Sequence, residues 1–593
     1  MAHFNLFFLS VIHLVKISLQ EENYIVRTDS CAIPNIPAQI SEFWQYPLNS
    51  TEPMKCSVYD ELLSYVTKEN NVATLRLRTD LIADIYGSES ALNCCYSLLY
   101  RNGTEEVPDE GVVTSQCIPF RKKVPLQHHL VWVKCNLAYA PTTLAYENIH
   151  QVITITEEVE RKGRSLKTRA QPISILFVVL DGVSRLNFVR TMPETRKYIL
   201  ENKFYEFKGY NKVHDNTFPN FMAWLSGMNL TDSIQVCKPK EVEGLSNCPL
   251  IWNTFRRSGY ATAYAEDWSS ISTFNYLKKG FKYPPTDYYF KPYIDATDGL
   301  YIQYQDTMPF CTGPVSAGER ILNLAEDFTR TMRGLPSFGV FWMNTFSHNN
   351  MNTTRKMDSR MKRFFETLKS DGVLDENVVI FLSDHGNRFG NLIGTPRGFF
   401  EERLPMNYIS LPTWFRNKFT KESKNFQENA NKLTSTYDLY VTLQHLIVLS
   451  GLDYTIKTSR ACSTCQSLFQ ELPVDRGCPH AGIPEKWCSC IGHLKYEFLS
   501  AQDMRELEKI IQHTIDGPIK NTMELDQIVK SSYAYSIENV VESERRKNPF
   551  RGNEIVNYRL VRFVTDLFSP YQIMLSKSNS SESTRIVHIR KVY

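Results

Sequence analysis

Three near-continuous runs of apolar residues stand out in the middle of the chain, at 173–180, 338–343 and 378–382. Runs without polar interruption are typical of parallel strands that are buried on both faces. Helical periodicity lies between these runs, for example over 316–332 and 355–370. Strands that alternate with helices predict right-handed crossovers. We therefore expect an α/β domain at 171–455, built as a doubly wound, mostly parallel sheet with helices on both faces.

The pattern before this domain is different, because apolar and polar residues alternate in short stretches such as 73–78 and 130–134. Alternation with a period of two predicts half-buried strands. Residues 21–160 also contain six cysteines, so we expect a β-rich, disulfide-containing N-terminal domain. The basic stretch at 161–170 is interpreted as a solvated linker, with proteolytic processing at its basic pair as the alternative.

The last region, 456–593, is expected to be a small Cys-rich α+β region. It opens with five cysteines, and its patterns predict a helix over 500–516 and strands over 558–568 and 585–592. Cys462 and Cys465 have the spacing of half a zinc site, but a disulfide is the expected use of such a pair in a secreted chain.

Several features point to the secretory pathway. Residues 1–20 are mostly apolar and resemble a signal peptide without its usual basic start, with an uncleaved membrane anchor as the alternative. The 14 cysteines, an even number, fit an oxidising compartment. Five Asn-x-Ser/Thr sequons are candidate glycosylation sites: Asn49, Asn102, Asn229, Asn352 and Asn579. We expect a glycoprotein that is secreted or resides in the secretory lumen, or a signal-anchored form of it.

Composition excludes little beyond one class of partner. A chain of 593 residues is too long for one core. Its hydrophobic share of 42% and charged share of 22% are ordinary for a globular protein. The net charge is +3, and no stretch interleaves aromatic and basic residues. We therefore predict no nucleic-acid polymer as a partner.

The most informative chemical feature follows the apolar run at 378–382, where Asp384 and His385 stand in the sequence Ser-Asp-His-Gly. Open α/β sheets bind ligands at the carboxyl ends of their parallel strands. A carboxylate beside an imidazole suits Zn²⁺ or Mn²⁺. Asp181 follows the run at 173–180 in the same way, although Asp-Gly after a strand is also a common turn.

Two further segments contribute candidate residues. Asn344 and His348 come just after the run at 338–343. Thr217 stands at the start of an amphipathic helix, where capping the helix is the ordinary role of a threonine. Polar residues that gather at strand ends and at a helix start are unusual for a core, so we expect them to form one site.

These residues give the chain a resemblance to the alkaline phosphatase superfamily over its core domain. The stretch from Thr217 to Asn220 is similar to the nucleophile segment of nucleotide pyrophosphatase/phosphodiesterases. Asp181 resembles their first metal-binding strand end, and the Asp-His-Gly at 384–386 resembles their metal ligands. The segment 259–262 resembles a Gly-Tyr-x-Thr turn of sulfatases. Over most of its length the chain also resembles an animal family labelled sulfatase-like, through 181–188 and 383–390.

The resemblance implies a metal-dependent phosphoester hydrolase or phosphotransferase. One divalent metal, Zn²⁺ or Mn²⁺ with Ca²⁺ as the alternative, would be held by Asp181, Thr217, Asp384 and His385. The metal would make the Thr217 hydroxyl a nucleophile, and a covalent phospho-threonine would follow. His348 would protonate the leaving group or bind a second metal. The substrate would be a phosphoester, either amine-bearing or lipid-linked.

The chain departs from the two-metal members of the superfamily at Asn344, where they carry Asp. The third histidine of their second metal site cannot be identified either, so one metal is expected rather than two. The remaining set is similar to single-metal phosphoethanolamine and phosphoglycerol transferases. Four residues are candidates for substrate binding: Asn344, Arg388, Glu266 and Asp267.

These candidates each have an ordinary alternative. Arg388 would contact a phosphoryl oxygen or pair with a surface acid. Glu266 and Asp267 would bind a substrate ammonium group or cap a surface turn.

Two other functions remain as alternatives. A sulfuric ester hydrolase would need a formylglycine, made in sulfatases from Cys or Ser in a Cys-x-Pro-x-Arg stretch. The stretch at 117–121 matches, but it precedes Asp181 instead of following it, and we expect Cys117 to form a disulfide. A non-catalytic secreted binding protein on the same fold is the second alternative. The neutral Asn344 favours it, and the intact ligand set at the other positions argues against it.

Overall fold

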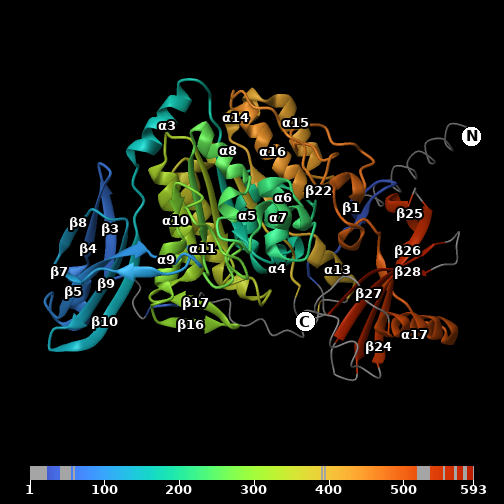
Figure 1. Ribbon diagram of the computed structural model, residues 1–593, viewed down its shortest axis with the longest axis horizontal. Coiled ribbons are helices and arrows are strands. Elements are labelled where there is room, and N and C mark those ends of the chain that lie inside the picture. Colours follow the sequence, from blue (N-terminus) through green and yellow to red (C-terminus); the bar gives the residue numbers. More distant parts are fainter. Residues whose placement is uncertain are drawn as a thin grey trace, which may run out of the picture.

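The computed structural model describes residues 23–39, 55–57, 61–388, 392, 395–516, 535–551, 554–565, 570–578 and 584–591. The expected signal peptide at 1–20 and the sequons at Asn49 and Asn579 lie outside these residues. A β-rich part, a central α/β part and a C-terminal sheet follow one another along the longest axis (Figure 1). No helix in the described part of the chain is both long and apolar enough to cross a membrane.

A seven-stranded sheet forms the centre of the molecule. Its strands, in spatial order, are β12 (Tyr205–Glu206), β21 (Asn407–Ser410), β20 (Asn377–Leu382), β11 (Ser174–Leu180), β19 (Ser337–Met343), β14 (Ala261–Glu266) and β15 (Tyr288–Tyr289). Neighbours from β20 to β15 are parallel, and β21 runs antiparallel to both of its neighbours. The prediction of a mostly parallel sheet is confirmed, and its three predicted strands begin within one residue of their expected starts.

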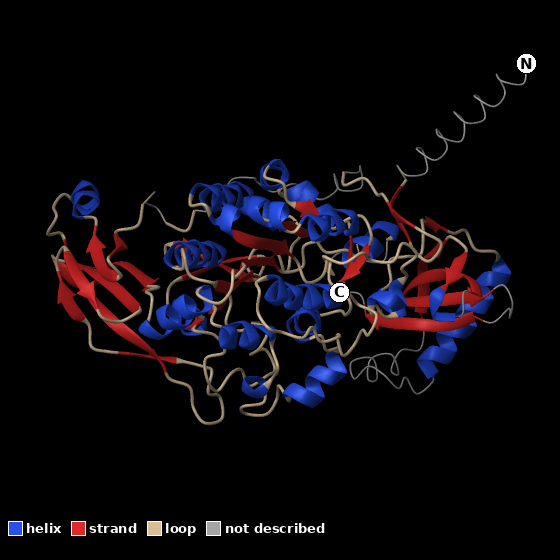
Figure 2. Cartoon of the chain, turned by 90° about the horizontal axis from the view of Figure 1, so that it is seen from above, coloured by secondary structure: helices blue, strands red, loops and turns tan. Residues whose placement is uncertain are grey.

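Helices cover both faces of this sheet, as the view from above shows (Figure 2). The first face carries α6 (Thr217–Ser226), α8 (Ile251–Ser258), α14 (Thr413–Lys418), α15 (Thr420–Asn429) and α16 (Thr436–Leu449). The second face carries α4 (Arg185–Thr191), α5 (Pro193–Glu201), α9 (Lys291–Thr297), α10 (Ala317–Thr331), α11 (Asp358–Ser370) and α12 (Val373–Glu376). The doubly wound architecture is therefore as expected, and α10 and α11 are the two helices predicted at 316–332 and 355–370. Three further elements connect these: α7 (Leu230–Cys237), the 3₁₀ turn η3 (Thr353–Met357) and α13 (Pro396–Arg403).

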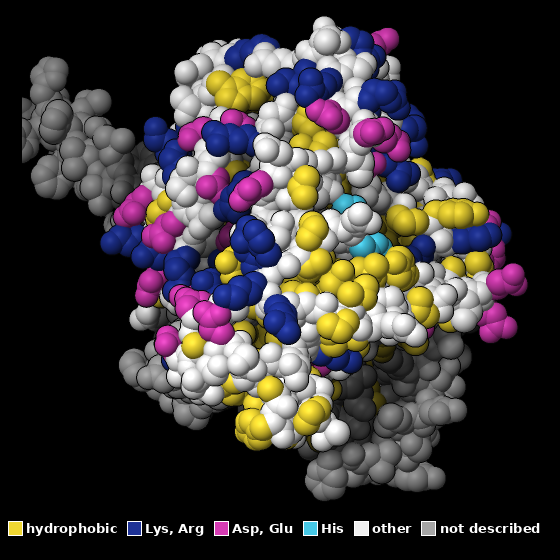
Figure 3. Space-filling view, turned by 90° about the vertical axis from the view of Figure 1, so that its left-hand side faces the viewer, with side chains coloured by type: hydrophobic (Ala, Val, Ile, Leu, Met, Phe, Trp, Pro, Cys, Tyr) yellow, Lys and Arg dark blue, Asp and Glu magenta, His cyan; other side chains and the backbone are white. Residues whose placement is uncertain are grey.

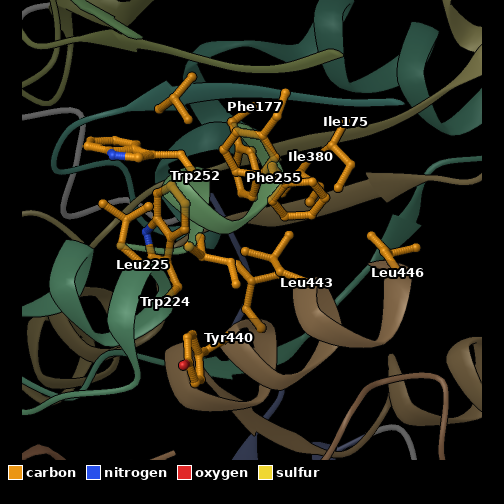
Figure 4. Close-up of a cluster of buried hydrophobic side chains, with 14 of the residues drawn as sticks. Ile175, Phe177, Trp224, Leu225, Trp252, Phe255, Ile380, Tyr440, Leu443 and Leu446 are labelled. Carbon is orange, nitrogen blue, oxygen red and sulfur yellow. The ribbon is translucent and has the colours of Figure 1, made fainter. Parts of the chain in front are cut away.

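Strand β11 shows why its sequence is apolar from Ile175 to Leu180. Ile175, Phe177 and Val179 point into the cluster with α6, α8 and α16. The alternate residues of the strand pack against the helices of the other face. Figure 4 shows the first cluster, in which Phe177 of β11 meets Trp224 of α6 with ring centroids 4.5 Å apart. This packing fixes α6, and with it Thr217, against the sheet.

The N-terminal part is β-rich, as predicted. One sheet contains β3 (Ser64–Glu69), β4 (Val72–Leu77) and β8 (Lys123–Leu126). The other contains β10 (Ala140–Gln151), β9 (Leu130–Leu137), β5 (Leu92–Arg101) and β6 (Val112–Thr114), with β7 (Ile118–Phe120) beside β5. Helix α2 (Thr79–Tyr86) follows β4. Figure 3 shows the end of the molecule that this part forms, where hydrophobic side chains gather beside histidine side chains.

The basic stretch at 161–170 is not a linker. Most of it belongs to helix α3 (Glu157–Lys167), which is capped by Thr156 and has acidic residues in its first turn and basic residues in its last. This charge order complements the helix dipole. Val159, Gly163 and Leu166 form the buried face of the helix, and Lys162 forms an ion pair with Asp287 at 2.7 Å. The basic residues are thus the polar side of a packed helix.

Two expected domain boundaries also differ from the structure. Strands β1 (Tyr24–Arg27) and β2 (Ala32–Pro34) lie beside the C-terminal region, to which the Cys31–Cys490 disulfide joins them. Leu468, Phe469 and Leu472 belong to the core of the central domain. The grouping of residues 21–160 as one domain and of 456–593 as another is therefore too simple.

A C-terminal sheet completes the fold. Its strands are β23 (Leu494–Tyr496), β24 (Tyr535–Ser543), β26 (Glu554–Thr565), β27 (Pro570–Ser578) and β28 (Thr584–Lys591), with β25 (Arg546–Asn548) beside β26. Helix α17 (Ala501–Asp516) packs against it through Leu507 and Ile511. The helix and the two strands predicted here are confirmed within the described residues.

All fourteen cysteines form disulfides, which confirms the expected use of Cys462, Cys465 and Cys117. The pairs are Cys31–Cys490, Cys56–Cys311, Cys94–Cys135, Cys95–Cys117, Cys237–Cys248, Cys462–Cys465 and Cys478–Cys488. Seven disulfides fit an oxidising compartment. Cys478, Cys488 and Cys490 lie close together because two disulfides, Cys478–Cys488 and Cys31–Cys490, are neighbours.

The packing of α6 on the sheet can be tested at Trp224. Its side chain is fully buried, so Trp224→Ala is expected to lower the free energy of unfolding by about 3–5 kcal/mol. Urea unfolding followed by fluorescence measures the change. Tyr139→Ala removes a ring that is 82% exposed and is the control. Equal stability of the two variants would contradict the packing.

Candidate metal and nucleophile site

Two neighbouring strand ends bring the predicted ligands together. Asp181 directly follows β11, and Asp384 and His385 are the second and third residues after β20. The strands are parallel and adjacent, with Val179 opposite Leu382. All three ligand side chains are at most 2% exposed. The predicted convergence of these residues is thus what the sheet produces.

Three atoms of this group face one another without a hydrogen-bond partner: Asp181 Oδ1, Asp384 Oδ2 and His385 Nε2. The His385 nitrogen lies 3.2 Å from the Asp384 oxygen and 3.8 Å from the Asp181 oxygen, and all three atoms are within 4.8 Å of one another. Buried polar atoms are rarely left without a partner. Three of them at one point, two carboxylate oxygens and an imidazole nitrogen, fit a divalent cation such as Zn²⁺ or Mn²⁺.

The remaining polar atoms of the three side chains have partners that fix their orientation. His385 Nδ1 donates to the carbonyl of Gly386 at 2.9 Å, so the lone pair of Nε2 points toward the carboxylates. Asp384 Oδ1 accepts from the backbone N–H of Gly182 at 3.2 Å. Such supporting bonds are typical of metal ligands, because they fix the tautomer and the rotamer.

The electrostatics of the group are unfavourable without a cation. Burial, followed by the neighbouring Asp384, raises the pKa of Asp181 to about 7, and the charge of Arg388 opposes this rise. Burial lowers the pKa of His385. The first shift disfavours the carboxylate form of Asp181, and the second disfavours the imidazolium form of His385. A bound divalent cation would oppose the rise in the pKa of Asp181.

Thr217 is the first residue of α6, and Asn216 occupies the N-cap position. The capping role that we considered for Thr217 is therefore wrong. Its hydroxyl instead donates to Asp181 Oδ2 at 3.0 Å, the oxygen of Asp181 that is not part of the unpartnered group. The hydroxyl thus lies directly beside the candidate ligands and at the positive end of a helix, where a negative charge is stabilised.

Asn220 holds this segment in place, a role that was not predicted for it. Its Oδ1 accepts from the backbone N–H groups of Val213 and His214, at 2.9 and 3.1 Å. Its Nδ2 donates to the carbonyls of His214 and Asn216. One buried amide therefore binds both ends of the loop that carries Thr217.

Asp267 is not on the surface and so does not cap a surface turn. It is 3% exposed, and its carboxylate accepts four hydrogen bonds from the backbones and side chains of Asn344 and Thr345, at 2.6 to 3.2 Å. The role of Asp267 is to hold the loop after β19. Asn344 also accepts from Trp342 Nε1 at 3.1 Å, so its side-chain amide is occupied within the protein.

Glu266 is buried as well, which again excludes a surface turn. It accepts from the Tyr264 hydroxyl at 2.6 Å and from the Thr273 backbone N–H at 2.7 Å. Burial raises the pKa of Glu266 to about 7. Binding of an ammonium group by Glu266 stays a prediction.

His348 and Arg388 meet at the edge of the ligand group. Arg388 donates to Asn216 Oδ1, and its other terminal nitrogen lies 3.3 Å from His348 Nε2. Burial lowers the pKa of His348, and the charge of Arg388 adds to this effect. Arg388 thus connects the loop of Thr217 with the loop of His348.

A buried cluster of charges supports the site from behind, and it too was not predicted. Glu402 of α13 accepts from Lys212 at 2.9 Å and from Arg403 at 3.1 Å, and it also contacts Arg590 of β28. Its backbone carbonyl accepts from Gly386 at 3.1 Å. A Cβ at Gly386 would lie 1.6 Å from the carbonyl oxygen of Glu401. The Gly of the Asp-His-Gly motif is therefore required by the close approach of α13.

Three of the sequons lie in the described part of the chain. Asn102 and Asn229 are exposed, and Asn352 is partly buried. Asn229 Oδ1 also caps α7 by accepting from the backbone N–H of Asp232 at 2.8 Å. Glycosylation of these residues stays a prediction.

Comparison with known proteins now adds a family. A family model described as "Protein of unknown function (DUF229)" matches residues 50–525. The chain belongs to this family. No curated protein sequence matches this DUF229 chain.

Several solved structures are similar to the DUF229 chain. One is a protein in that superfamily from Vibrio parahaemolyticus, at 11% identity over 74% of this chain and 92% of that one, with a TM-score of 0.35. Another is the phosphonate monoester hydrolase of Silicibacter pomeroyi, at 11% identity over 69% of this chain and 90% of that one, with a TM-score of 0.36. A third is the lipoteichoic acid synthase LtaP of Listeria monocytogenes, at 13% identity over 56% of this chain and 78% of that one, with a TM-score of 0.33. At identities and TM-scores this low, none of them says what the DUF229 chain does.

The raised pKa of Asp181 gives a test of the ligand group without metal. In the folded, metal-free protein this pKa is about 7 instead of 3.8. Because the folded protein binds this proton more tightly than the unfolded chain, the proton stabilises the fold. This contribution is fully present below about pH 3.8 and is lost as the pH rises through 7. We expect the Tm measured in chelator to fall between pH 5 and pH 8, and Asp181→Asn to reduce that fall.

The matched control for this experiment is Asp375→Asn. Asp375 is more than half exposed and pairs with Lys369 at 2.9 Å on the surface. The control should show the same fall in Tm as the wild type. An undiminished fall in Asp181→Asn would contradict the buried, unpaired state of Asp181.

Proposed function

We propose that the chain is a secreted or lumenal metal-dependent phosphoester hydrolase or phosphotransferase that acts through Thr217. The observation that carries the proposal is the Thr217 hydroxyl, which lies 3.0 Å from a carboxylate oxygen of Asp181, beside three unpartnered ligand atoms. The seven disulfides and the exposed sequons support the compartment. One metal is proposed rather than two, because Asn344 is neutral and the carboxylate of Asp267 accepts hydrogen bonds from it instead of being free to bind a second metal.

The chain's own residues support a two-step transfer. A divalent metal bound by Asp181, Asp384 and His385 would lower the pKa of the Thr217 hydroxyl and polarise the phosphoryl group. Thr217 Oγ1 attacks phosphorus and passes its proton to Asp181 Oδ2, the atom to which it already donates. The bond between phosphorus and the alcohol oxygen of the substrate breaks, this oxygen takes a proton from solvent or from His348, and a phospho-threonine forms. The N-terminus of α6 and the Arg388 guanidinium stabilise the charge on the phosphoryl oxygens.

The second step returns the enzyme to its starting state. Water, or a second alcohol in a transferase, attacks phosphorus, the bond to Thr217 Oγ1 breaks, and Oγ1 takes back the proton held by Asp181 Oδ2. His348 lies at the edge of the group and handles the proton of the attacking molecule or of the leaving group. An amine-bearing or lipid-linked phosphoester remains our proposal for the substrate class.

A phosphoester is favoured over a sulfate ester by two observations. The nucleophile position holds Thr217, which is not a precursor of formylglycine. Cys117, in the stretch that resembles the formylglycine motif, forms a disulfide with Cys95. The chain therefore lacks a free cysteine for this modification among its fourteen.

The test is turnover of p-nitrophenyl phosphate, bis(p-nitrophenyl) phosphate and p-nitrophenyl sulfate by protein from a secretory host. We expect hydrolysis of one of the two phosphoesters, and Thr217→Ala should lower kcat by about 1,000-fold or more, since it removes the nucleophile. Acid quench and mass spectrometry should find phosphate on Thr217 in the wild type. Thr254→Ala, on the surface of α8, is the control. Full activity of Thr217→Ala would exclude the proposed nucleophile.

A further inference from the structure

The residue after His348 is bound on three sides. Asn349 Nδ2 donates to the carbonyl of Asp306 at 3.1 Å and to the Thr307 hydroxyl at 2.8 Å. Because both amide hydrogens are used in this way, Asn349 Oδ1 is the atom that faces His348. That oxygen lies 2.6 Å from His348 Nδ1. An amide oxygen only accepts, so His348 Nδ1 must carry a proton.

The other ring nitrogen of His348 meets the opposite requirement. His348 Nε2 lies 3.3 Å from a terminal nitrogen of Arg388. A guanidinium only donates, so Nε2 must accept. An acceptor on one side of the ring and a donor on the other select one tautomer. Burial and the charge of Arg388, which lower the pKa of His348, favour the same neutral form.

The turn that holds Asn349 is itself in an unusual conformation. Asp306 and Thr307 form the two-residue turn between β16 (Ile302–Gln305) and β17 (Met308–Thr312), at the lower edge of Figure 1. Their φ angles are 51° and 64°. Both positions of such a turn favour Gly, Asn or Asp, and a β-branched Thr with positive φ is strained. Backbone strain of this kind is found where a precise geometry is needed.

The surrounding structure keeps the turn in that conformation. Thr353 Oγ1 donates to Asp306 Oδ2 at 2.5 Å. Cys311 of β17 forms a disulfide with Cys56. The hairpin is therefore fixed both to the 3₁₀ turn after His348 and to the N-terminal region. Thr307 supplies a hydroxyl to Asn349 that the unstrained choice, glycine, would lack.

We propose that Asn349 is a positioning residue that fixes His348 in the tautomer with its proton on Nδ1, so that Nε2 is the atom that exchanges protons in the reaction. The inference rests on the proposed function. It makes His348 the base of the second step. With Arg388 bound to the phosphoryl oxygens, Nε2 takes a proton from water, the water oxygen bonds to phosphorus, and the bond from phosphorus to Thr217 Oγ1 breaks. Oγ1 takes back the proton that Asp181 Oδ2 holds. Nε2 then releases the proton to solvent.

The first test reads the tautomer directly and needs no activity. Long-range ¹H–¹⁵N spectra of protein labelled at histidine distinguish Nδ1–H from Nε2–H, and His348→Gln assigns the signal of His348. We expect Nδ1–H in the wild type and in Asn349→Asp, whose carboxylate also accepts. Asn349→Leu should show a mixture of tautomers. Nε2–H in the wild type, or an unchanged tautomer in Asn349→Leu, would overturn the inference.

The second test reads the step in which His348 acts, with bis(p-nitrophenyl) phosphate or p-nitrophenyl phosphate as the probe. Asn349→Leu should slow release of phosphate from Thr217 by about 10–100-fold, the usual cost of losing a supporting partner. Formation of phospho-Thr217 should stay near the wild-type rate, so the intermediate accumulates. Asn349→Asp should restore most of the rate. Equal slowing of both steps would reveal a merely structural role and overturn the inference.

A matched control distinguishes the loss of any side-chain amide from the loss of the Asn349 amide. Asn136 is partly exposed and donates to the carbonyl of Pro141 at 2.7 Å, in the N-terminal part. Asn136→Leu should leave the tautomer and both rates unchanged. Absence of phospho-Thr217 in the wild type would count against the proposed function alone, because the spectra would still report the tautomer of His348.

Discussion

Two carboxylates and an imidazole that face one another in the interior dominate the energetics of the site. Each is buried, and each leaves one polar atom without a partner, at Asp181 Oδ1, Asp384 Oδ2 and His385 Nε2. Burying unpaired charge is costly, and two adjacent carboxylates repel. A fold keeps such a group only where something compensates for it, and a divalent cation is the partner that suits all three atoms. The surrounding bonds, from Gly182, Gly386 and Thr217, orient the group for that partner.

The sheet explains why these atoms meet. Parallel neighbours β11 and β20 end at the same edge. Gly182 and Asp384, which are 202 positions apart in the chain, therefore become adjacent, as open α/β sheets allow at that edge. Helix α6 then brings the Thr217 hydroxyl to the same carboxylate, and its packing on Phe177 keeps it there. Behind the edge, the C-terminal strand β28 contributes Arg590 to the cluster around Glu402. That contribution lies beyond residues 50–525, the part matched by the family model.

The parts of this site that could be predicted from sequence are those with a local signature. Apolar runs marked β11 and β20, and the polar residues after them marked Asp181, Asp384 and His385. The supporting residues have no such signature, because their partners are distant: Asn220 acts through a loop, Asp267 through the end of another strand, and Glu402 through three cations from different segments. The error at 161–170 has a similar cause. Charge alone indicated a linker, whereas the spacing of Val159, Gly163 and Leu166 gives the stretch a buried helical face.

The central claim is that the group of Asp181, Asp384 and His385 holds one divalent metal. Elemental analysis of protein purified from a secretory host measures this directly, with Asp384→Asn analysed beside it and thermal unfolding used to show that the variant is folded. The account predicts about one Zn²⁺ or Mn²⁺ per chain in the wild type and its loss in the folded variant. A wild type without metal, or a folded variant that retains it in full, would contradict the account.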